Sequence, residues 1–140
     1  MDEITRQLLS VLRITDGADE QRISKLLAYV GLELPDDYLD FLRYSDGVEG
    51  AIGPIYWLAL WSIEQLIELN EAYSSSKHAP GLILIGSSLS VTAFGIDTRS
   101  KLVTEMSFVV MDFLELEWGF EKHRSCTFRD FIQYLHTYSG

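Results

Sequence analysis

The segment 34–73 constrains the fold more than any other part of the chain, because signals for a helix, a strand and a second helix follow one another in it. A helix is predicted after Pro35, since a proline keeps the residue before it out of the α region. The β-branched and aromatic run Ile55–Trp61 predicts a strand. Ser62, followed three residues later by Gln65, forms a capping-box pattern that begins the next helix. The fold must therefore combine helices with strands.

The rest of the chain divides into a helical first part and a later part that is rich in strands. Further helices are predicted over Glu3–Ile14, Asp19–Val30 and Phe128–Tyr138. Short apolar segments that predict strands are Leu82–Ile85, Val91–Ile96, Leu102–Met106 and Phe108–Met111. Strands that are adjacent in sequence favour a mostly antiparallel sheet with helices packed against it. We therefore expect an α+β fold in a single domain over residues 1–140.

Apolar residues at helical spacing indicate which helix faces are buried. In the first helix, the residues of this stripe are Ile4, Leu8, Val11 and Leu12. Between the third helix and the first strand, Gly47, Gly50 and Gly53 interrupt the chain. They predict a loop that is either mobile or held at positive φ angles.

The charge of the chain limits its partners, because 21 acidic residues oppose 11 basic ones and give a net charge of −10. Nucleic acids and anionic membranes attract basic surfaces, so we expect neither as a partner. A basic protein partner is compatible with the charge, since opposite potentials speed and orient encounter; solubility alone is the other explanation. The first residues lack the pattern of a secretory signal, and no apolar run is long enough to span a bilayer, so we expect a cytoplasmic protein.

A series of apolar motifs runs from about Ile23 onward. Its members, in order, are Leu34-Pro35, Tyr38, Phe41, Leu42, Asp46-Gly47, Ile55–Leu60, Ile63–Tyr73, Ile85-Gly86, Phe94–Asp97, Thr127-Phe128, Phe131 and Leu135. This succession resembles the SUKH superfamily, which includes the Smi/Knr cell-wall regulator-like proteins. The turn Gly86–Ser90 departs from the pattern, because it holds one glycine where many members have a glycine-rich or acidic-glycine turn.

The resemblance implies a non-enzymatic protein. Bacterial members of the superfamily are widely regarded as immunity proteins, which bind and neutralise a cognate polymorphic toxin, often a nuclease. Eukaryotic relatives are scaffold or regulatory proteins. We therefore expect a protein-binding module, most specifically an immunity protein for a basic toxin domain. A regulatory scaffold with endogenous partners is the alternative, and a small hydrolase that uses carboxylates or the single cysteine is a further one.

The titratable residues predict no catalytic, metal or cofactor site. The three histidines, His78, His123 and His136, do not lie at zinc-binding spacing, and no CxxC motif is present. A nucleophilic role for Cys126 would need a partner histidine, and no local signature supplies one. Carboxylates are numerous, but nothing in the sequence singles out a pair for acid–base chemistry.

An acidic stretch supplies the predicted partner contacts. No basic residue occurs from Glu105 to Glu121, and acidic and apolar residues alternate within Asp112–Trp118. Alternation places one set of side chains in the core and the other outside. The predicted electrostatic contacts are Asp112, Glu115, Glu117 and Glu121, with Trp118 as an aromatic anchor.

The other two tryptophans, Trp57 and Trp61, lie an even number of residues apart and so would share a face of one strand. If that face is inward, both belong to the core, as most such stripes do. If it is outward, both could anchor a partner. The sequence leaves both interpretations open.

Overall fold

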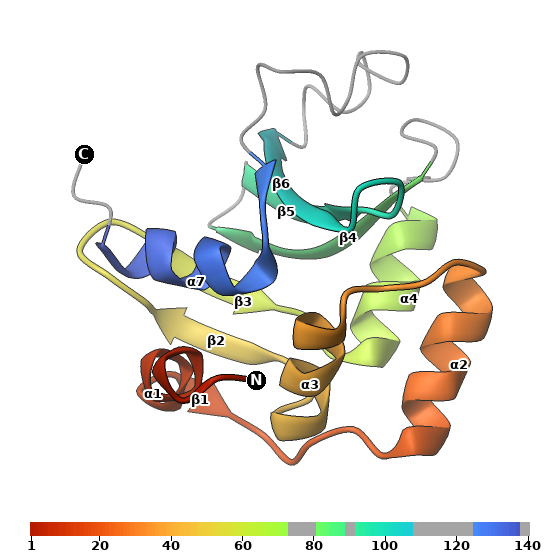
Figure 1. Ribbon diagram of the computed structural model, residues 1–140, viewed down its shortest axis with the longest axis horizontal. Helices are drawn as coiled ribbons and strands as arrows, with labels where there is room; N and C mark the ends of the chain where they lie inside the picture. The colour runs from red at the N-terminus through yellow and green to blue at the C-terminus, as the bar shows by residue number, and fades with distance from the viewer. Residues whose placement is uncertain (73–80, 89–91, 108–124, 138–140) are drawn as a thin grey trace.

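The centre of the fold is an antiparallel sheet whose strands are paired in the order of the chain. The computed structural model describes residues 1–72, 81–88, 92–107 and 125–137 (Figure 1). Its strands are β1 (Arg13–Ile14), β2 (Val48–Ala51), β3 (Trp57–Leu60), β4 (Leu82–Ser88), β5 (Thr92–Asp97), β6 (Leu102–Ser107) and β7 (Ser125–Cys126). Each strand pairs antiparallel with the next. The predicted α+β class is confirmed, while the strand predicted over Phe108–Met111 lies outside the described residues.

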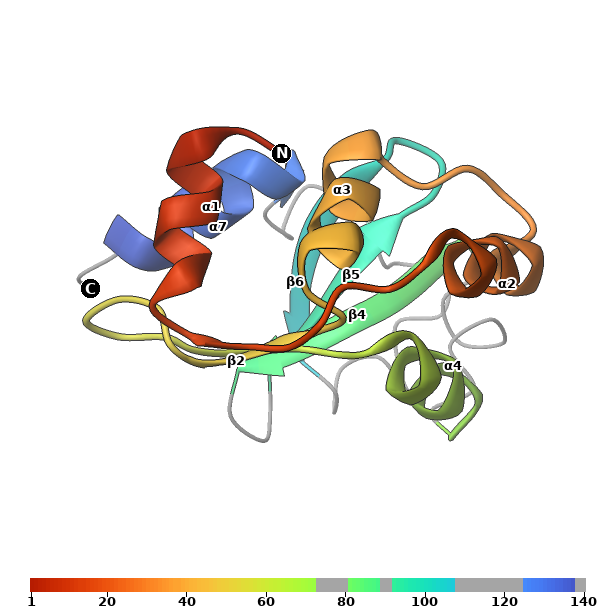
Figure 2. The same ribbon diagram turned by 90° about the horizontal axis from the view of Figure 1, so that it is seen from below.

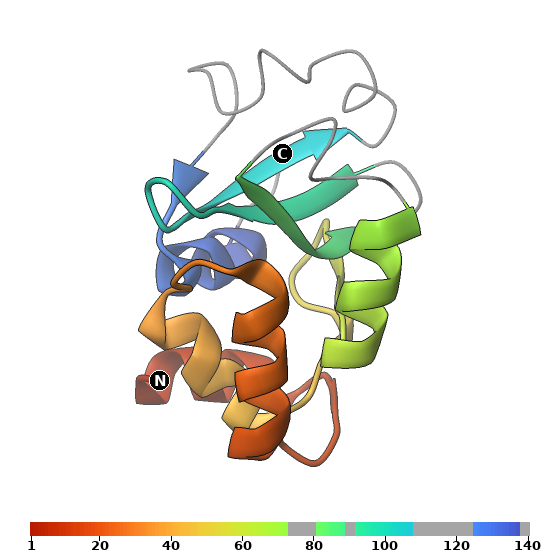
Figure 3. The ribbon, with the colours of Figure 1, turned by 90° about the vertical axis from the view of Figure 1, so that its right-hand side faces the viewer.

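The helices pack in two groups against this sheet. Their bounds are α1 (Glu3–Ser10), α2 (Glu20–Val30), α3 (Asp36–Tyr44), α4 (Ile63–Ala72) and α7 (Phe128–Thr137). Helices α1, α3 and α7 lie on one side of the sheet, and both α1 and α3 contact α7 (Figure 2). Helix α4 contacts β4, and α2 lies beside α4 (Figure 3). Chain segments that are far apart in sequence thus meet around the sheet.

The helix ends agree with the capping signals in the sequence. The Asp19 side chain accepts a hydrogen bond from the backbone N–H of Arg22, at 2.9 Å, and begins α2. Ser62 and Gln65 bond reciprocally at the start of α4, at 3.3 and 3.2 Å, which confirms the capping box. Gly31 ends α2 in the left-handed region, with φ 75°.

The first helix is shorter than predicted. It ends at Ser10, and the chain then joins the sheet as the edge strand β1, where Arg13 pairs with Glu49 and Ile14 with Val48. The predicted helix extended to Ile14 because local periodicity contains no information about β2, the distant strand with which Arg13 and Ile14 pair.

The buried face of α1 agrees with the predicted stripe only in part, since Leu8 packs against the core as expected. Thr5 and Leu9 face the interior, and Leu12 is buried after the helix ends. Ile4 is 54% exposed and Val11 is 75% exposed. The prediction that Ile4 and Val11 are buried was wrong, because α1 packs against α7 with the adjacent face, which carries Thr5 and Leu9.

The glycine-rich segment forms a strand, β2, where a loop was predicted. Gly47 and Gly50 adopt φ angles of 95° and 152°, so positive φ angles do occur there. Gly53, in the connection to β3, lies against the end of α7: a Cβ atom added to it would be 2.5 Å from the carbonyl oxygens of Leu135 and His136. This segment is therefore fixed by close backbone contact.

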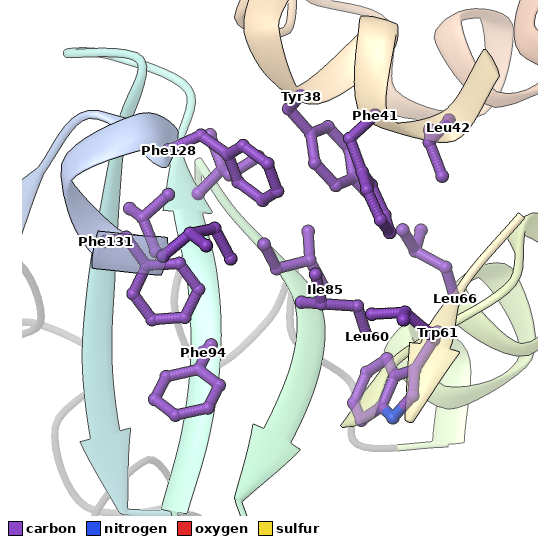
Figure 4. Close-up of a cluster of buried hydrophobic side chains, with 14 of the residues drawn as sticks. Tyr38, Phe41, Leu42, Leu60, Trp61, Leu66, Ile85, Phe94, Phe128 and Phe131 are labelled. Atoms are coloured by element: carbon purple, nitrogen blue, oxygen red, sulfur yellow. The ribbon is translucent and has the colours of Figure 1, made fainter. Parts of the chain in front are cut away.

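An aromatic cluster joins the helices to the sheet (Figure 4). The ring of Tyr38 on α3 meets that of Phe128 on α7 edge-on, with centroids 5.5 Å apart. The ring of Phe131 packs on Phe94 of β5, at 4.8 Å. These rings are buried, and edge-to-face pairs add to the stabilisation that burial of their area provides.

Candidate functional site

Outside the described residues lie the predicted partner contacts Asp112, Glu115, Glu117, Trp118 and Glu121. Their role in partner binding stays a prediction. The described residues contain a second candidate surface, which is formed by strands β1, β2 and β3.

The two neighbouring tryptophans lie in different surroundings. Trp57 begins β3 opposite Ala51 of β2, and its side chain is 43% exposed. Trp61 directly follows β3 and is 8% exposed, so the core interpretation is confirmed for this residue. Ala59, which has the same parity as Trp57 along the strand, adds only a methyl group to that face. With small neighbours on this face, the Trp57 indole remains exposed.

A groove of about 440 Å³ lies along β2 and β3. We call it the β2–β3 groove; its lining includes Arg13, Glu49, Ala59, Trp61 and Gln65. Arg13 lies opposite Glu49 in the register of β1 and β2, so a cation and a carboxylate face each other at this groove.

Asp46 organises the end of this groove, where α3, β2 and α4 meet. Its Oδ1 accepts a hydrogen bond from the backbone N–H of Ile63, at 3.0 Å, and its Oδ2 pairs with the guanidinium of Arg22. Arg22 also binds Glu64 in a bidentate pair, in which Nε donates to Oε1 at 3.0 Å. Hydrogen bonds to Glu64 and Asp46 raise the pKa of Arg22. The hydrogen bond from Arg22 lowers the pKa of Glu64. One guanidinium thus joins α2 to α4 beside the groove.

The sequence indicates no role for Asp46 beyond its place in the Asp46-Gly47 motif. Its partners Ile63 and Arg22 lie 17 and 24 positions away along the chain. No local motif connects these positions, so the arrangement has no signal in the sequence.

Cys126 and His136, which were considered for thiol or metal chemistry, pack within the fold. No group of three or more His, Cys, Asp or Glu side chains that could hold a metal ion occurs in the described ranges. Cys126 is half-buried in β7, opposite Val103 of β6. The Nδ1 atom of His136 lies 2.9 Å from the carbonyl oxygen of Ile52, and so holds the β2–β3 connection against α7. His78 and His123 lie outside the described residues.

Comparison with protein families gives a match over most of the chain. The model of the SMI1/KNR4 family (SUKH-1) matches residues 17–134. The chain belongs to this family. The resemblance that the apolar motifs indicated is thereby confirmed. A search of curated proteins found no match.

The SUKH-1 match separates the chain into a shared part and an N-terminal segment. The match begins after β1 and ends within α7, so α1 and Arg13 lie outside it. It includes Asp46 and Trp61 at the β2–β3 groove, Trp57 on β3, and the predicted acidic contacts within 112–121. Among the described helices of this SUKH-1 chain, none has the length and apolar character needed to cross a membrane.

Proposed function

We propose that this SUKH-1 chain is a non-enzymatic protein-binding module, and most specifically an immunity protein that binds and neutralises a basic toxin domain. Its membership of the family carries the proposal, because bacterial members of the superfamily are regarded as immunity proteins. A toxin that acts on nucleic acid presents a basic surface, and an acidic binder can cover that surface.

The distribution of charge supports a basic partner. Of the acidic residues in the described ranges, those without an ion-pair partner there are Asp16, Asp19, Asp36, Asp37, Glu49, Glu68, Glu71 and Asp130. Their charges are not neutralised within the described part of the fold and contribute to the field around the molecule. Such a field accelerates association with a protein of opposite charge.

The β2–β3 groove supports a protein as the partner. Trp57 is a large, exposed aromatic side chain on β3, the strand whose Ala59 and Leu60 line the groove. Tryptophan is enriched among the residues that dominate binding energy at interfaces. A polypeptide can bury this indole and pair with Arg13 and Glu49 at once.

The direct test is neutralisation. The tagged chain is purified from lysate of its own cell at low salt, and a captured toxin domain is then expressed in a bacterial host with and without the chain. We expect the toxin alone to stop growth and co-expression to restore it. Binding that is lost at high salt would support an electrostatic interface. Capture of housekeeping proteins, with no toxin and no rescue, would instead favour the regulatory scaffold.

The predicted acidic contacts have a matched control. The combined variant Asp112→Asn, Glu115→Gln, Glu117→Gln and Glu121→Gln should slow association strongly at low salt. The control combines Glu3→Gln, Asp16→Asn, Glu68→Gln and Asp130→Asn, which removes the same charge from other positions. Equal rates for the two variants would show that total charge matters and that the predicted residues are not the interface.

A further inference from the structure

A second hollow lies away from the β2–β3 groove, between the α2–α3 connection and the β5–β6 hairpin. Its volume is about 380 Å³. We call it the α2–α3 pocket; its lining residues are Leu27, Glu33, Leu34, Pro35, Asp36, Leu39 and Lys101. Leu34 and Leu39 are buried members of the core, so the apolar floor rests on rigid structure. The same connection exposes Leu32, which is 56% accessible. A pocket of this size and character can accept an aliphatic side chain.

An ion pair crosses between the two elements that form this pocket. Lys101 Nζ donates to Glu33 Oε2 at 2.7 Å, and the two residues lie 68 positions apart. Glu33 raises the pKa of Lys101, with a smaller contribution from Asp36, and Lys101 lowers the pKa of Glu33. Both side chains remain largely exposed, with relative accessibilities of 48% and 83%. An exposed pair of this kind is weak and can exchange partners.

The backbone of Lys101 is unusual. It is the last residue of the turn between β5 and β6 and has φ 62°, and within the described ranges it is the one residue other than glycine with a positive φ. Hairpin turns commonly place glycine at such a left-handed position. A lysine there carries a conformational cost that glycine would avoid. What the lysine adds is an ammonium group beside Glu33 and the apolar pocket.

The charged side of the pocket has an excess of acid. Glu33 and Asp36 face one cation, Lys101, and Asp36 has no ion-pair partner among the described residues. A basic side chain brought by a partner can therefore pair with Asp36, or replace Lys101 at Glu33. The apolar floor and the acidic side then act on neighbouring residues of the same partner segment.

We propose that the α2–α3 pocket is an anchor site for a basic protein partner, which inserts one aliphatic side chain against Leu27 and Leu39 and places an adjacent Lys or Arg beside Glu33 and Asp36. The intramolecular pair between Lys101 and Glu33 competes with that incoming cation. The inference deepens the proposed function and takes the basic character of the partner from it.

The pocket can be tested without the natural partner. The probe is acetyl-Lys-Leu-Lys-amide, titrated into the isotope-labelled full chain and followed by NMR of the leucine methyl groups. We expect saturable shifts at Leu27, Leu34 and Leu39, with a Kd of roughly millimolar order. The charge control, acetyl-Glu-Leu-Glu-amide, should produce no saturable shift. Absence of saturation with the basic peptide, or an equal response to the acidic peptide, would overturn the proposal.

Variants separate the charged contacts from general effects of charge. Combining Glu33→Gln with Asp36→Asn should weaken binding of the basic peptide about 3- to 10-fold. Lys101→Gly keeps the turn and removes the competing cation, so it should strengthen binding about 2- to 5-fold. The control combines Glu68→Gln with Glu71→Gln on α4 and should change nothing. An effect of the control equal to that of the pocket variant would contradict a local site.

The outcomes distinguish this site from the proposed function. Neutralisation of a toxin by the Glu33→Gln, Asp36→Asn variant with unchanged affinity would reject the pocket and leave the immunity function standing. Peptide binding at the pocket in a chain that neutralises no toxin would reject the immunity function alone.

Discussion

The side-chain amide of Asn70 binds the backbone of Leu84 as a neighbouring strand would. Its Oδ1 accepts from the Leu84 N–H and its Nδ2 donates to the Leu84 carbonyl, both at 2.8 Å. The ladder between β3 and β4 extends as far as Trp61, whose N–H donates to Ile85. Asn70 therefore continues the backbone hydrogen bonding of β4 beyond the end of its pairing with β3. It attaches α4 to the sheet beside the β2–β3 groove.

Replacing Asn70 with leucine should destabilise the protein by about 2–4 kcal/mol. The side chain is buried, and its loss leaves the Leu84 N–H and carbonyl without partners in the interior. Urea unfolding measures the change in the free energy of unfolding. The control Glu68→Leu, at an exposed position of the same helix, should stay within about 0.5 kcal/mol. Similar values for both variants would argue against a special role for the amide.

Truncation of the two tryptophans should lower the free energy of unfolding by different amounts. Trp61→Ala removes a buried side chain and should lower the free energy of unfolding by about 3 kcal/mol. Trp57→Ala should lower it by less than about 1 kcal/mol, because much of that indole is already in water.

In a binding assay with the captured partner, Trp57→Ala should weaken affinity at least about 10-fold if the indole is an anchor. Unchanged affinity would show that the Trp57 indole is not an anchor.

Local signals explain which parts of the fold could be predicted. The capping box of Ser62 and Gln65 depends on residues that are close in sequence, and the structure contains it. Strand β2 was missed because its glycines resemble a loop, and only pairing with β1 and β3 makes it a strand. The exposure of Ile4 and Val11 was not foreseen, because the helix that selects the buried face of α1 lies more than a hundred residues away.

The surfaces were harder to predict than the elements. The β2–β3 groove combines Arg13, Glu49 and Trp61, and the α2–α3 pocket combines Leu27 with Lys101. Each set comes from elements that only the tertiary structure brings together. Trp57 could be recognised as an anchor candidate from its residue type, but its exposure depends on Ala51, which the sequence does not place beside it.

Acid should weaken the connection between α2 and α4. Arg22 lowers the pKa of Glu64 in the folded protein, so this pair stabilises the fold above the pKa of Glu64 in the unfolded chain. The contribution is lost as the pH falls through the lower folded pKa. Because Glu64 is largely exposed, the change should be less than about 1 kcal/mol.

The measurement for this pair is urea unfolding at about pH 6 and at about pH 3, for the wild type and for Glu64→Gln. The variant should be less stable at the higher pH, and its difference from the wild type should shrink in acid. Glu68→Gln, which removes a carboxylate of α4 that has no described ion pair, is the control. A difference that grows as the pH falls would have the wrong sign for a lowered carboxyl pKa.

Alanine substitutions at two glycines separate the cost of a steric contact from the cost of a positive φ angle. Gly53→Ala would place a Cβ atom 2.5 Å from two carbonyl oxygens of α7, so the β2–β3 connection or the helix must shift. We expect a loss of about 2–4 kcal/mol in the free energy of unfolding, together with loss of the bond between His136 and Ile52. Gly31→Ala meets no atom within 4 Å but must keep φ at 75°, which should cost about 1 kcal/mol. Urea unfolding ranks the two variants, and a larger loss for Gly31→Ala would mean that the contact of Gly53 with α7 is loose in solution.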